Sequence, residues 1–214
     1  MNRDIKDMRE NYDKSFLQKT NLKSNPIDQF SYWFDEVKAT NTKEPNAMIL
    51  ATSNSNGTPS LRTVLLKEMD AEGFVFYTNY NSQKAKDIAE NPIVSLLFLW
   101  KEMERQVRIT GLAEKISIAQ SSEYFKSRPR GSKIGAWVSP QSEIIASREI
   151  LESKNADIEA KFKDSEDIPL PLFWGGYIVK PITVEFWQGR PDRLHDRLKY
   201  SRKNKNWIIS RLAP

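Results

Sequence analysis

Cysteine is absent from this 214-residue sequence, and histidine occurs once, at His195. The absence of cysteine excludes disulfides, thiol nucleophiles, iron–sulfur clusters and cysteine-based zinc sites. It also fits the reducing cytoplasm, which is the compartment we expect. A single histidine cannot build a multi-histidine metal centre, so a metal would depend on carboxylates alone. We therefore expect no catalytic metal.

Long hydrophobic runs are also missing. The longest, residues 93–100, is far too short to cross a bilayer and indicates a buried strand instead. Residues 1–14 carry charges of both signs without an apolar centre. We therefore expect neither a signal peptide nor a membrane partner.

Several nucleotide and hydrolase motifs are absent as well. The sequence has no glycine-rich dinucleotide fingerprint after a strand, no Walker loop and no Gly-x-Ser-x-Gly elbow. A nicotinamide cofactor in a doubly wound fold and nucleotide hydrolysis are therefore poorly supported.

The chain does carry a formal charge of +5, from 33 lysines and arginines against 28 acidic residues. Such a charge indicates either a mildly basic surface or an anionic ligand. The two signs are mostly interspersed, whereas nucleic-acid binding favours a contiguous basic stripe. We therefore expect a phosphorylated small molecule, and no nucleic acid, as the partner.

Hydrophobic periodicity predicts an N-terminal arm over residues 1–24 and one domain over residues 25–214. A helix begins at Asn25-Pro26, and further helices are expected over residues 84–90, 118–127, 133–138 and, with an amphipathic pattern, 146–162. Strands are expected over residues 47–52, 61–67, 74–78, 93–100, 105–113, 176–179, 183–188, 193–199 and 207–211. Because short turns join most strands, the fold class is mainly β with peripheral helices, as an antiparallel sheet or barrel.

The segment 193–199 offers one candidate site. On a strand, Arg193, His195 and Arg197 share one face and Leu194 the other. Three cationic or potentially cationic groups on one face repel each other unless an anionic or electron-rich group lies among them. A ligand site and a solvated edge strand remain equally open from this segment alone.

A second candidate combines Tyr124 and Arg128, four residues apart on one helix face, with Ser132. A guanidinium beside hydroxyl groups suits a phosphate. The alternative, an arginine-decorated helix end that complements the helix dipole, is favoured when this segment is taken alone.

A third group contains residues of two strands and a short helix. Arg62 and Lys67 are an odd number of residues apart, so either a bulge intervenes or they serve different parts of a ligand. Ser82 is expected to cap the helix, whose N-terminus could receive an anion. Ordinary strand-end lysines are the alternative reading. The remaining members of the group are Tyr77, Thr78 and Lys84.

Eight segments, taken in order, resemble one known family. EFWQ (185–188) followed by RLHDR (193–197) looks like its signature. The others are RTVLLK (62–67), FYTN (76–79), RQVR (105–108), SRPR (127–130), GAWVS (135–139), FWGG (173–176) and RLAP (211–214). Together they make the chain similar, over residues 8–214, to the pyridoxine/pyridoxamine 5′-phosphate oxidase family.

The resemblance implies an FMN-binding split β-barrel that forms a homodimer, with the FMN sites at the subunit interface. It implies oxidation of pyridoxine or pyridoxamine 5′-phosphate to pyridoxal 5′-phosphate, with dioxygen as electron acceptor. Hydrogen peroxide, and ammonia from the amine, are the by-products. Two alternatives remain: a non-oxidase flavin-binding protein or flavin reductase on the same fold, and a binding protein without turnover.

The resemblance also implies the site residues. Arg193 and His195 lie against the substrate ring as the catalytic pair, and Arg9 and Tyr12 belong to the arm that covers the substrate. The implied substrate-binding residues are Arg9, Tyr12, Lys67, Tyr124, Arg128, Ser132, Arg193, Leu194 and His195. The implied FMN-binding residues are Arg62, Thr63, Val64, Leu65, Leu66, Lys67, Tyr77, Thr78, Gln83, Lys84, Gln106, Gln141, Ser142, Trp187 and Arg197.

Gln83 departs from the family pattern, which usually has a basic residue just before the lysine that contacts the FMN phosphate. One cationic contact is therefore expected to be missing. An exposed charge-assisted contact contributes about 1–2 kcal/mol, so we expect FMN affinity to fall about tenfold without a change in the chemistry.

Overall fold

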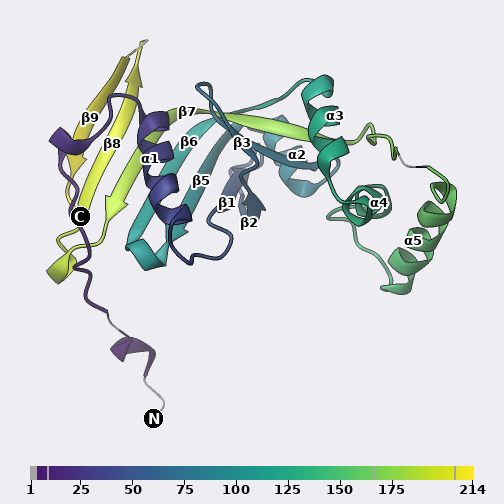
Figure 1. Cartoon of the computed structure of the whole chain (residues 1–214), viewed down its shortest axis with the longest axis horizontal. Helices are drawn as coiled ribbons and strands as arrows, with labels where there is room; N and C mark the ends of the chain where they lie inside the picture. The colour runs from purple at the N-terminus through teal and green to yellow at the C-terminus, as the bar shows by residue number, and fades with distance from the viewer. Residues whose placement is uncertain (1–3, 9, 166, 205) are drawn as a thin grey trace. The chain divides into compact units, whose positions relative to one another are not determined.

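The computed structural model describes residues 4–8, 10–165, 167–204 and 206–214 of the chain (Figure 1). Its α-helices are α1 (Pro26–Lys38), α2 (Gln83–Glu90), α3 (Ile118–Ser127), α4 (Arg130–Val138) and α5 (Glu149–Lys161). Its strands are β1 (Ala47–Ser53), β2 (Pro59–Leu65), β3 (Glu68–Met69), β4 (Phe74–Asn79), β5 (Ile93–Trp100), β6 (Arg105–Lys115), β7 (Trp174–Gln188), β8 (Asp196–Lys203) and β9 (Asn206–Leu212). Short 3-10 helices span Ile5–Asp7, Lys19–Asn21, Lys101–Met103 and Pro191–Arg193.

The strands belong to one sheet. Hydrogen-bonded neighbours follow the order β2-β1-β5-β6-β7-β4-β3, while β8 pairs with β7 and β9. The pairs β3–β4, β4–β7, β7–β8 and β8–β9 run antiparallel. The expected antiparallel sheet with peripheral helices is confirmed. Among the described residues, no helix combines the length and apolarity that crossing a membrane requires.

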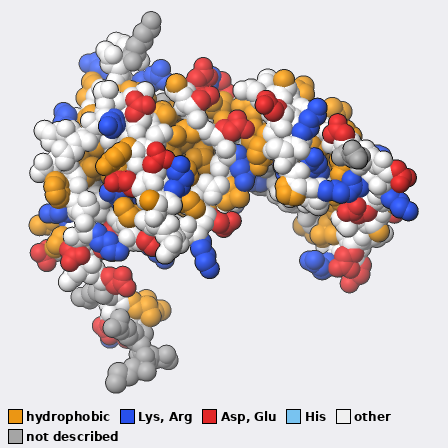
Figure 2. Space-filling model, in the orientation of Figure 1, with side chains coloured by type: hydrophobic (Ala, Val, Ile, Leu, Met, Phe, Trp, Pro, Cys, Tyr) orange, Lys and Arg blue, Asp and Glu red, His pale blue; other side chains and the backbone are white. Residues whose placement is uncertain are grey.

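The chain divides into two compact units. The first comprises Met1–Leu50, Ser95–Gly111 and Pro181–Pro214, and the second comprises Ala51–Val94 and Leu112–Lys180. Four strands, β1, β5, β6 and β7, contribute residues to both. On the face drawn in Figure 2, lysine, arginine and acidic side chains are intermixed, as their distribution in the sequence predicts.

In the first unit, α1 starts where the sequence predicts. Asn25 is the N-cap, and its side-chain oxygen accepts a hydrogen bond from the backbone N–H of Ile27 at 2.9 Å. Pro26 occupies the first turn, where its missing N–H leaves no intrahelical bond unmade. The cap and the proline together fix the start of the helix.

Aromatic side chains pack α1 onto the sheet of the first unit. Phe30 contacts Phe98 of β5 with ring centroids 4.8 Å apart, and Trp33 contacts Phe186 of β7 at 5.1 Å. Both contacts have edge-to-face geometry, which aromatic pairs prefer over a face-to-face sandwich. All four side chains are almost completely buried.

In the second unit, β4 pairs with the first part of β7, so that Tyr77 lies opposite Gly176. Helices α3 and α4 pack beside this pair around a hydrophobic cluster. The cluster consists of Phe125, Ile134, Val138, Phe162, Ile168 and Trp174.

A turn before β4 brings two backbones close together. Asp70 accepts hydrogen bonds from the N–H groups of Glu72 and Gly73 at 2.7 and 3.1 Å, as an Asx turn does. A Cβ on Gly73 would lie 2.2 Å from the carbonyl oxygen of Val179 in β7. Only glycine permits this approach.

We expect Gly73→Ala to lower the free energy of unfolding by about 1–3 kcal/mol, because overpacking against backbone cannot be relieved by a side-chain rotation. Urea denaturation measures the change. Gly135→Ala is the matched control, since a Cβ there meets nothing within 4 Å. Equal stability of the Gly73 and Gly135 variants would contradict the steric account.

Two predicted strands, 176–179 and 183–188, are one continuous strand, β7. The separate prediction was wrong, because the strand continues through Pro181. In β7, residues 174–179 pair with β4 and residues 183–188 pair with β8. Pro181 falls between these two pairings, so its missing N–H removes no bond to β4 or β8.

The predicted strand 193–199 was also wrong at its start. β8 begins at Asp196, and the preceding residues form the 3-10 turn Pro191–Arg193. Arg193 and His195 therefore do not share a strand face with Arg197. The cause is the left-handed backbone at Asp192 and Arg193, with φ of 55° and 61°, which alternating polarity cannot signal.

Smaller differences concern element ends. β2 stops at Leu65, so Lys67 lies beyond the strand, where its N–H donates to the Val75 carbonyl oxygen at 2.9 Å. α4 begins at Arg130 rather than at residue 133, and β3 was not predicted. The amphipathic prediction for α5 was wrong, because none of its residues is buried and only Leu151 and Ile158 pack against the cluster.

Candidate active site

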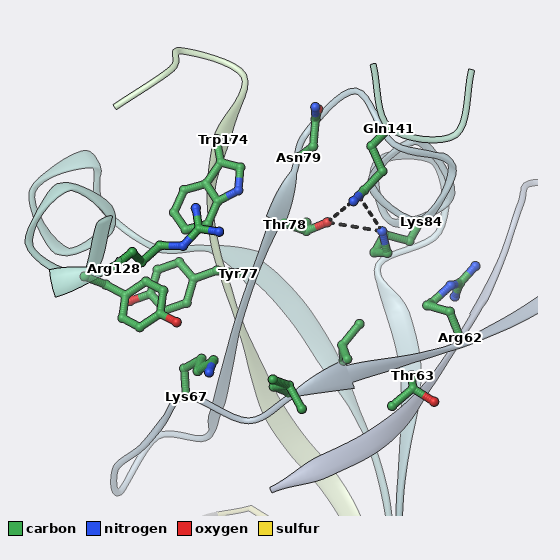
Figure 3. Close-up of a pocket in the computed structure, with 13 residues that line it drawn as sticks. Arg62, Thr63, Lys67, Tyr77, Thr78, Asn79, Lys84, Arg128, Gln141 and Trp174 are labelled. Atoms are coloured by element: carbon green, nitrogen blue, oxygen red, sulfur yellow. Dashed lines mark hydrogen bonds between the residues drawn. The ribbon is translucent and has the colours of Figure 1, made fainter. Parts of the chain in front are cut away.

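A cavity of about 530 Å³ lies within the second unit, where β2, β4, α2 and α3 direct side chains into a common space (Figure 3). Its size is typical of a small-molecule site. The lining residues are Arg62, Thr63, Val64, Leu65, Lys67, Tyr77, Thr78, Asn79, Lys84, Tyr124, Arg128, Gln141 and Trp174.

Most of these residues are ones that the family resemblance implies for FMN or substrate. Asn79 and Trp174 are additions, and the signal for them was present, because they stand in the FYTN and FWGG segments. The implied residues of the second unit that are not among the lining residues are Leu66, Gln83, Ser132 and Ser142. Leu66 is buried in the core, whereas Ser132 is exposed in the first turn of α4.

Two cations meet at one end of the cavity. Lys84 Nζ donates to Gln141 Oε1 at 2.8 Å and to Thr78 Oγ1 at 3.2 Å (Figure 3). Burial and, to a smaller extent, the nearby charge of Arg62 together lower the pKa of Lys84 to about 8. Burial also lowers the pKa of Arg62, against an opposing effect of Asp87. Groups whose charged form is disfavoured in this way gain from a bound anion.

Ser82 precedes α2 at the N-cap position, but the expected side-chain cap is wrong. Its side chain makes no capping hydrogen bond, and Oγ donates instead to the Asn79 carbonyl oxygen at 2.7 Å. Ser82 Oγ also accepts from Lys84 Nζ at 3.3 Å. Ser82 therefore supports the lysine rather than the helix end.

Stacked aromatic rings form the other end of the cavity. The ring of Tyr77 lies 3.9 Å from that of Tyr124 and 5.4 Å from that of Trp174, with nearly parallel planes. The guanidinium of Arg128 lies over the Trp174 ring at 4.7 Å. Tyr77 donates its hydroxyl to Glu68 at 2.7 Å, and burial raises its pKa, so the phenol stays protonated.

The donor set of the cavity fits phosphate groups. Arg128 Nη1 is buried and, among the described residues, finds no hydrogen-bond partner. Burial lowers the pKa of Arg128. A buried donor without an acceptor is costly, and a phosphate oxygen is the acceptor that a guanidinium pairs with most strongly. Arg62 and Lys84 offer a second anion position, so the residues present suit a phosphorylated cofactor together with a phosphorylated substrate.

The catalytic pair implied by the resemblance lies in the first unit. Arg193 is exposed on the turn Pro191–Arg193, in the left-handed region. A non-glycine residue in this region costs on the order of 1–3 kcal/mol and is held there by its surroundings. Arg193 and His195 line a cavity of about 440 Å³ with residues of the arm, among them Tyr12.

His195 has a defined orientation. Its Nδ1 accepts a hydrogen bond from the backbone N–H of Arg190 at 3.1 Å, so the neutral ring carries its proton on Nε2. Its ring lies 4.6 Å from that of Trp187 and 5.8 Å from that of Tyr12. Burial, and then the charge of Arg193, lower the pKa of His195. The imidazole is therefore mainly neutral at pH 7.

Arg197 is fixed from two sides. Its Nε donates to Glu185 at 2.9 Å, and its Nη1 donates to the Ala213 carbonyl oxygen at 2.8 Å. Glu185 also accepts from Arg108. Burial alone would raise the pKa of Glu185, but the hydrogen bonds from Arg197 and Arg108 outweigh it and lower the pKa.

The remaining implied residues also belong to the first unit. Gln106 and Trp187 line a cavity of about 680 Å³, to which Tyr12 also contributes. Leu194 is 70% exposed. Arg9 lies outside the described residues.

Residues 34–162 match the family model described as pyridoxamine 5′-phosphate oxidase. The chain belongs to the pyridoxamine 5′-phosphate oxidase family. Residues 174–214 match a second model, described as the pyridoxine 5′-phosphate oxidase C-terminal dimerisation region. The two matches include the whole cavity of the second unit, as well as Arg193, His195 and Arg197.

Full-length relatives of the oxidase family are similar to the chain. A pyridoxine/pyridoxamine 5′-phosphate oxidase of Rippkaea orientalis is 55% identical, over 99% of this chain and 100% of the relative. One of Salinibacter ruber is 50% identical, over 98% and 99%. The structure of PhzG from Burkholderia lata, in complex with tetrahydrophenazine-1-carboxylic acid, has a TM-score of 0.89 at 29% identity, over 96% and 100%. An FMN-binding protein of Nostoc punctiforme shares the fold, with a TM-score of 0.69 at 16% identity, over 92% and 98%.

The pKa of Lys84, about 8, predicts a pH-dependent affinity for a phosphate-bearing ligand such as FMN. A bound phosphate favours the charged amine, so binding takes up a proton above pH 8. Affinity for FMN should therefore fall about tenfold between pH 7 and pH 9, which fluorescence titration measures.

Two lysine variants on α2 test this assignment. Lys84→Met should bind FMN more weakly at pH 7 and lose most of the pH dependence. Lys86→Met removes an exposed lysine of the same helix and should retain it. An unchanged pH dependence in Lys84→Met would assign the proton to another group.

Proposed function

We propose that this chain oxidises pyridoxine 5′-phosphate and pyridoxamine 5′-phosphate to pyridoxal 5′-phosphate, with FMN as its cofactor. Dioxygen accepts the electrons and becomes hydrogen peroxide, and the amine substrate also releases ammonia. The observation that carries the proposal is the pair of cationic positions in one cavity. Arg62 and Lys84 stand at one position, and Arg128 stands at the other. Full-length relatives at 50–55% identity bear the corresponding name.

FMN fits the part of the cavity around Lys84. Arg62 and Lys84 would hold its phosphate, and Thr78 and Gln141 would hold polar atoms of the cofactor. When bound, FMN supplies the acceptor for the hydride that leaves the exocyclic carbon of the substrate. The protein contributes binding, orientation and exclusion of water.

The substrate phosphate is assigned to Arg128, with Lys67, Tyr124 and Ser132 as further donors. The support is the buried Nη1 of Arg128, which needs an acceptor. Stacking over Trp174 keeps the guanidinium plane fixed before the ligand arrives. A pre-oriented guanidinium loses less freedom on binding, which favours tight and specific recognition of the phosphate.

Arg193 and His195 are proposed to orient the substrate ring. A guanidinium is too basic to act as an ordinary general base, so Arg193 acts through its charge and its plane. His195 is held neutral with a proton on Nε2, so it donates a hydrogen bond rather than a charge. Both roles position the reacting carbon rather than supply chemistry.

The arm and the oligomeric state complete the proposal. Residues 1–24 would cover the bound substrate, and the packing of Tyr12 against the His195 ring supports this. The active protein would be a cytoplasmic homodimer with the FMN sites at the subunit interface. The match of residues 174–214 to a dimerisation region supports the homodimer.

An aerobic assay with added FMN tests the function. Purified protein is given each substrate separately, and pyridoxal 5′-phosphate and peroxide are followed together. We expect both products in equal amounts. A yellow, flavin-loaded protein that forms neither product would instead indicate a non-oxidase flavin protein on the same fold.

Arg193→Leu should reduce kcat about a hundredfold or more while FMN remains bound, because the ring loses an electrostatic contact in the transition state. Steady-state turnover at saturating substrate and the flavin content of the protein give the two quantities. Arg148→Leu removes an exposed arginine on the segment before α5 and should leave both unchanged. Wild-type turnover in Arg193→Leu would refute the assigned role.

Arg128→Leu should raise KM for the phosphorylated substrates about 10–100-fold, because a buried charge-assisted bond is lost. Oxidation of unphosphorylated pyridoxine, however slow, should not change. Lys126→Met, a change of an exposed lysine in the last turn of α3, which ends just before Arg128, is the control. If both kinds of substrate suffered equally in Arg128→Leu, the phosphate assignment would be wrong.

A further inference from the structure

A buried carboxylate stands behind the cavity of the second unit. Asp87, on α2, is 3% exposed. Its Oδ2 accepts a hydrogen bond from Thr52 Oγ1 at 2.6 Å, and its Oδ1 accepts one from Gln83 Nε2 at 2.7 Å. Arg62 Nη2 lies 3.8 Å from Oδ2. Neither Asp87 nor Thr52 lines the cavity, so neither is expected to touch a ligand there.

The Thr52 hydroxyl connects Asp87 to Arg62. A hydroxyl has one hydrogen, and a carboxylate can only accept, so the hydrogen of Thr52 points to Asp87. The Thr52 oxygen is then left as the acceptor for Arg62 Nη1, at 2.8 Å. Ser60 holds the guanidinium from its other side, through its carbonyl oxygen at 3.0 Å and its Oγ at 2.6 Å. The plane of the Arg62 guanidinium is therefore fixed before any ligand binds.

Gln83 has a place in this network. It stands where the family usually has a basic residue, and its side chain bonds to Asp87 rather than lining the cavity. The neutral amide of Gln83 satisfies the second oxygen of Asp87, and the guanidinium of Arg62 is the cation that lies near the carboxylate. The departure from the family pattern is thus accompanied by a hydrogen bond that supports Asp87.

We propose that Thr52 and Asp87 are positioning residues for Arg62. They hold its guanidinium in the orientation that receives the FMN phosphate, and Gln83 completes the hydrogen bonding of Asp87. The inference rests on the proposed function, in which Arg62 and Lys84 hold that phosphate. It adds two residues that act on the ligand only through another side chain.

The decisive test leaves the charge unchanged, because Asp87 also repels a phosphate and its removal would mix two effects. Thr52→Val keeps the shape of the side chain and removes the hydroxyl, while Thr52→Ser keeps the hydroxyl. Dissociation constants for FMN and for riboflavin, which lacks the phosphate, are measured on the cofactor-free proteins by flavin fluorescence. Glu90→Gln, on the same helix at an exposed carboxylate, is the control.

We expect Thr52→Val to weaken FMN binding about five- to tenfold, which is within the range for one lost hydrogen bond, and to leave riboflavin binding unchanged. Thr52→Ser should bind FMN within about twofold of wild type, and Glu90→Gln should match wild type. Wild-type FMN affinity in Thr52→Val would overturn the proposal. Equal losses for FMN and riboflavin would also overturn it, since they indicate general damage to the cavity.

Asp87→Asn provides a second test if Thr52→Val does not fold. The Asp87→Asn change should weaken FMN binding but not riboflavin binding when both are measured at high salt, which screens long-range repulsion. Where Thr52→Val folds, the Thr52→Val/Asp87→Asn double variant should bind FMN no more weakly than Thr52→Val, because both changes act through Arg62. Additive losses would contradict this. A wild-type protein that binds no FMN would refute the proposed function itself, whereas an unaffected Thr52→Val variant would refute only the present inference.

Discussion

Two positive charges held close together in a partly buried cavity are the constraint on which the second unit depends. Lys84 and Arg62 each lose solvation, and the charge of Arg62 makes the charged form of Lys84 less favourable still. The hydrogen-bond partners of Lys84 do not remove this unfavourable electrostatic energy, since Thr78, Gln141 and Ser82 give the amine neutral acceptors. A bound anion lowers this energy, so affinity for a phosphate is built into the site.

At the other end of the cavity, Arg128 is also poised for an anion, but it is held in place differently from Arg62. Among the described residues, Arg128 has an aromatic face rather than a carboxylate beside it, and one of its nitrogens has no acceptor. A carboxylate partner would have satisfied that nitrogen and competed with the ligand. Stacking fixes the guanidinium without competing, because the ring offers no strong hydrogen-bond acceptor. Arg62 is held differently: the Thr52 hydroxyl accepts a hydrogen bond from Arg62 and donates one to the carboxylate of Asp87.

Periodicity and capping predicted the parts of the fold that depend on local signals. α3 and β5 have the predicted bounds, and α1 begins at the predicted cap. The failures came where tertiary context overrides the local pattern. Pro181 lies inside a strand because the strand changes partners there, and a left-handed turn delays β8 until Asp196.

The candidate site, like the fold, could be predicted from the sequence only in part. Motif resemblance supplied most of the cavity lining, including residues from four separate elements that no single-segment argument would have joined. It supplied neither Thr52 nor Asp87. Their polar atoms matter only because β1 and α2 meet in three dimensions, and each looks like an ordinary strand or helix residue in the sequence.

The left-handed turn before β8 has an evolutionary consequence. Two successive non-glycine residues there adopt a conformation that β-branched side chains resist strongly. With the ring-orienting role proposed for Arg193, position 193 is therefore constrained twice, once by the ligand and once by the backbone conformation. Few amino acids satisfy both constraints, so the sequence of this short stretch can vary less than its solvent exposure suggests. Relatives that change substrate must either keep the turn and alter its neighbours, or rebuild the connection as a whole.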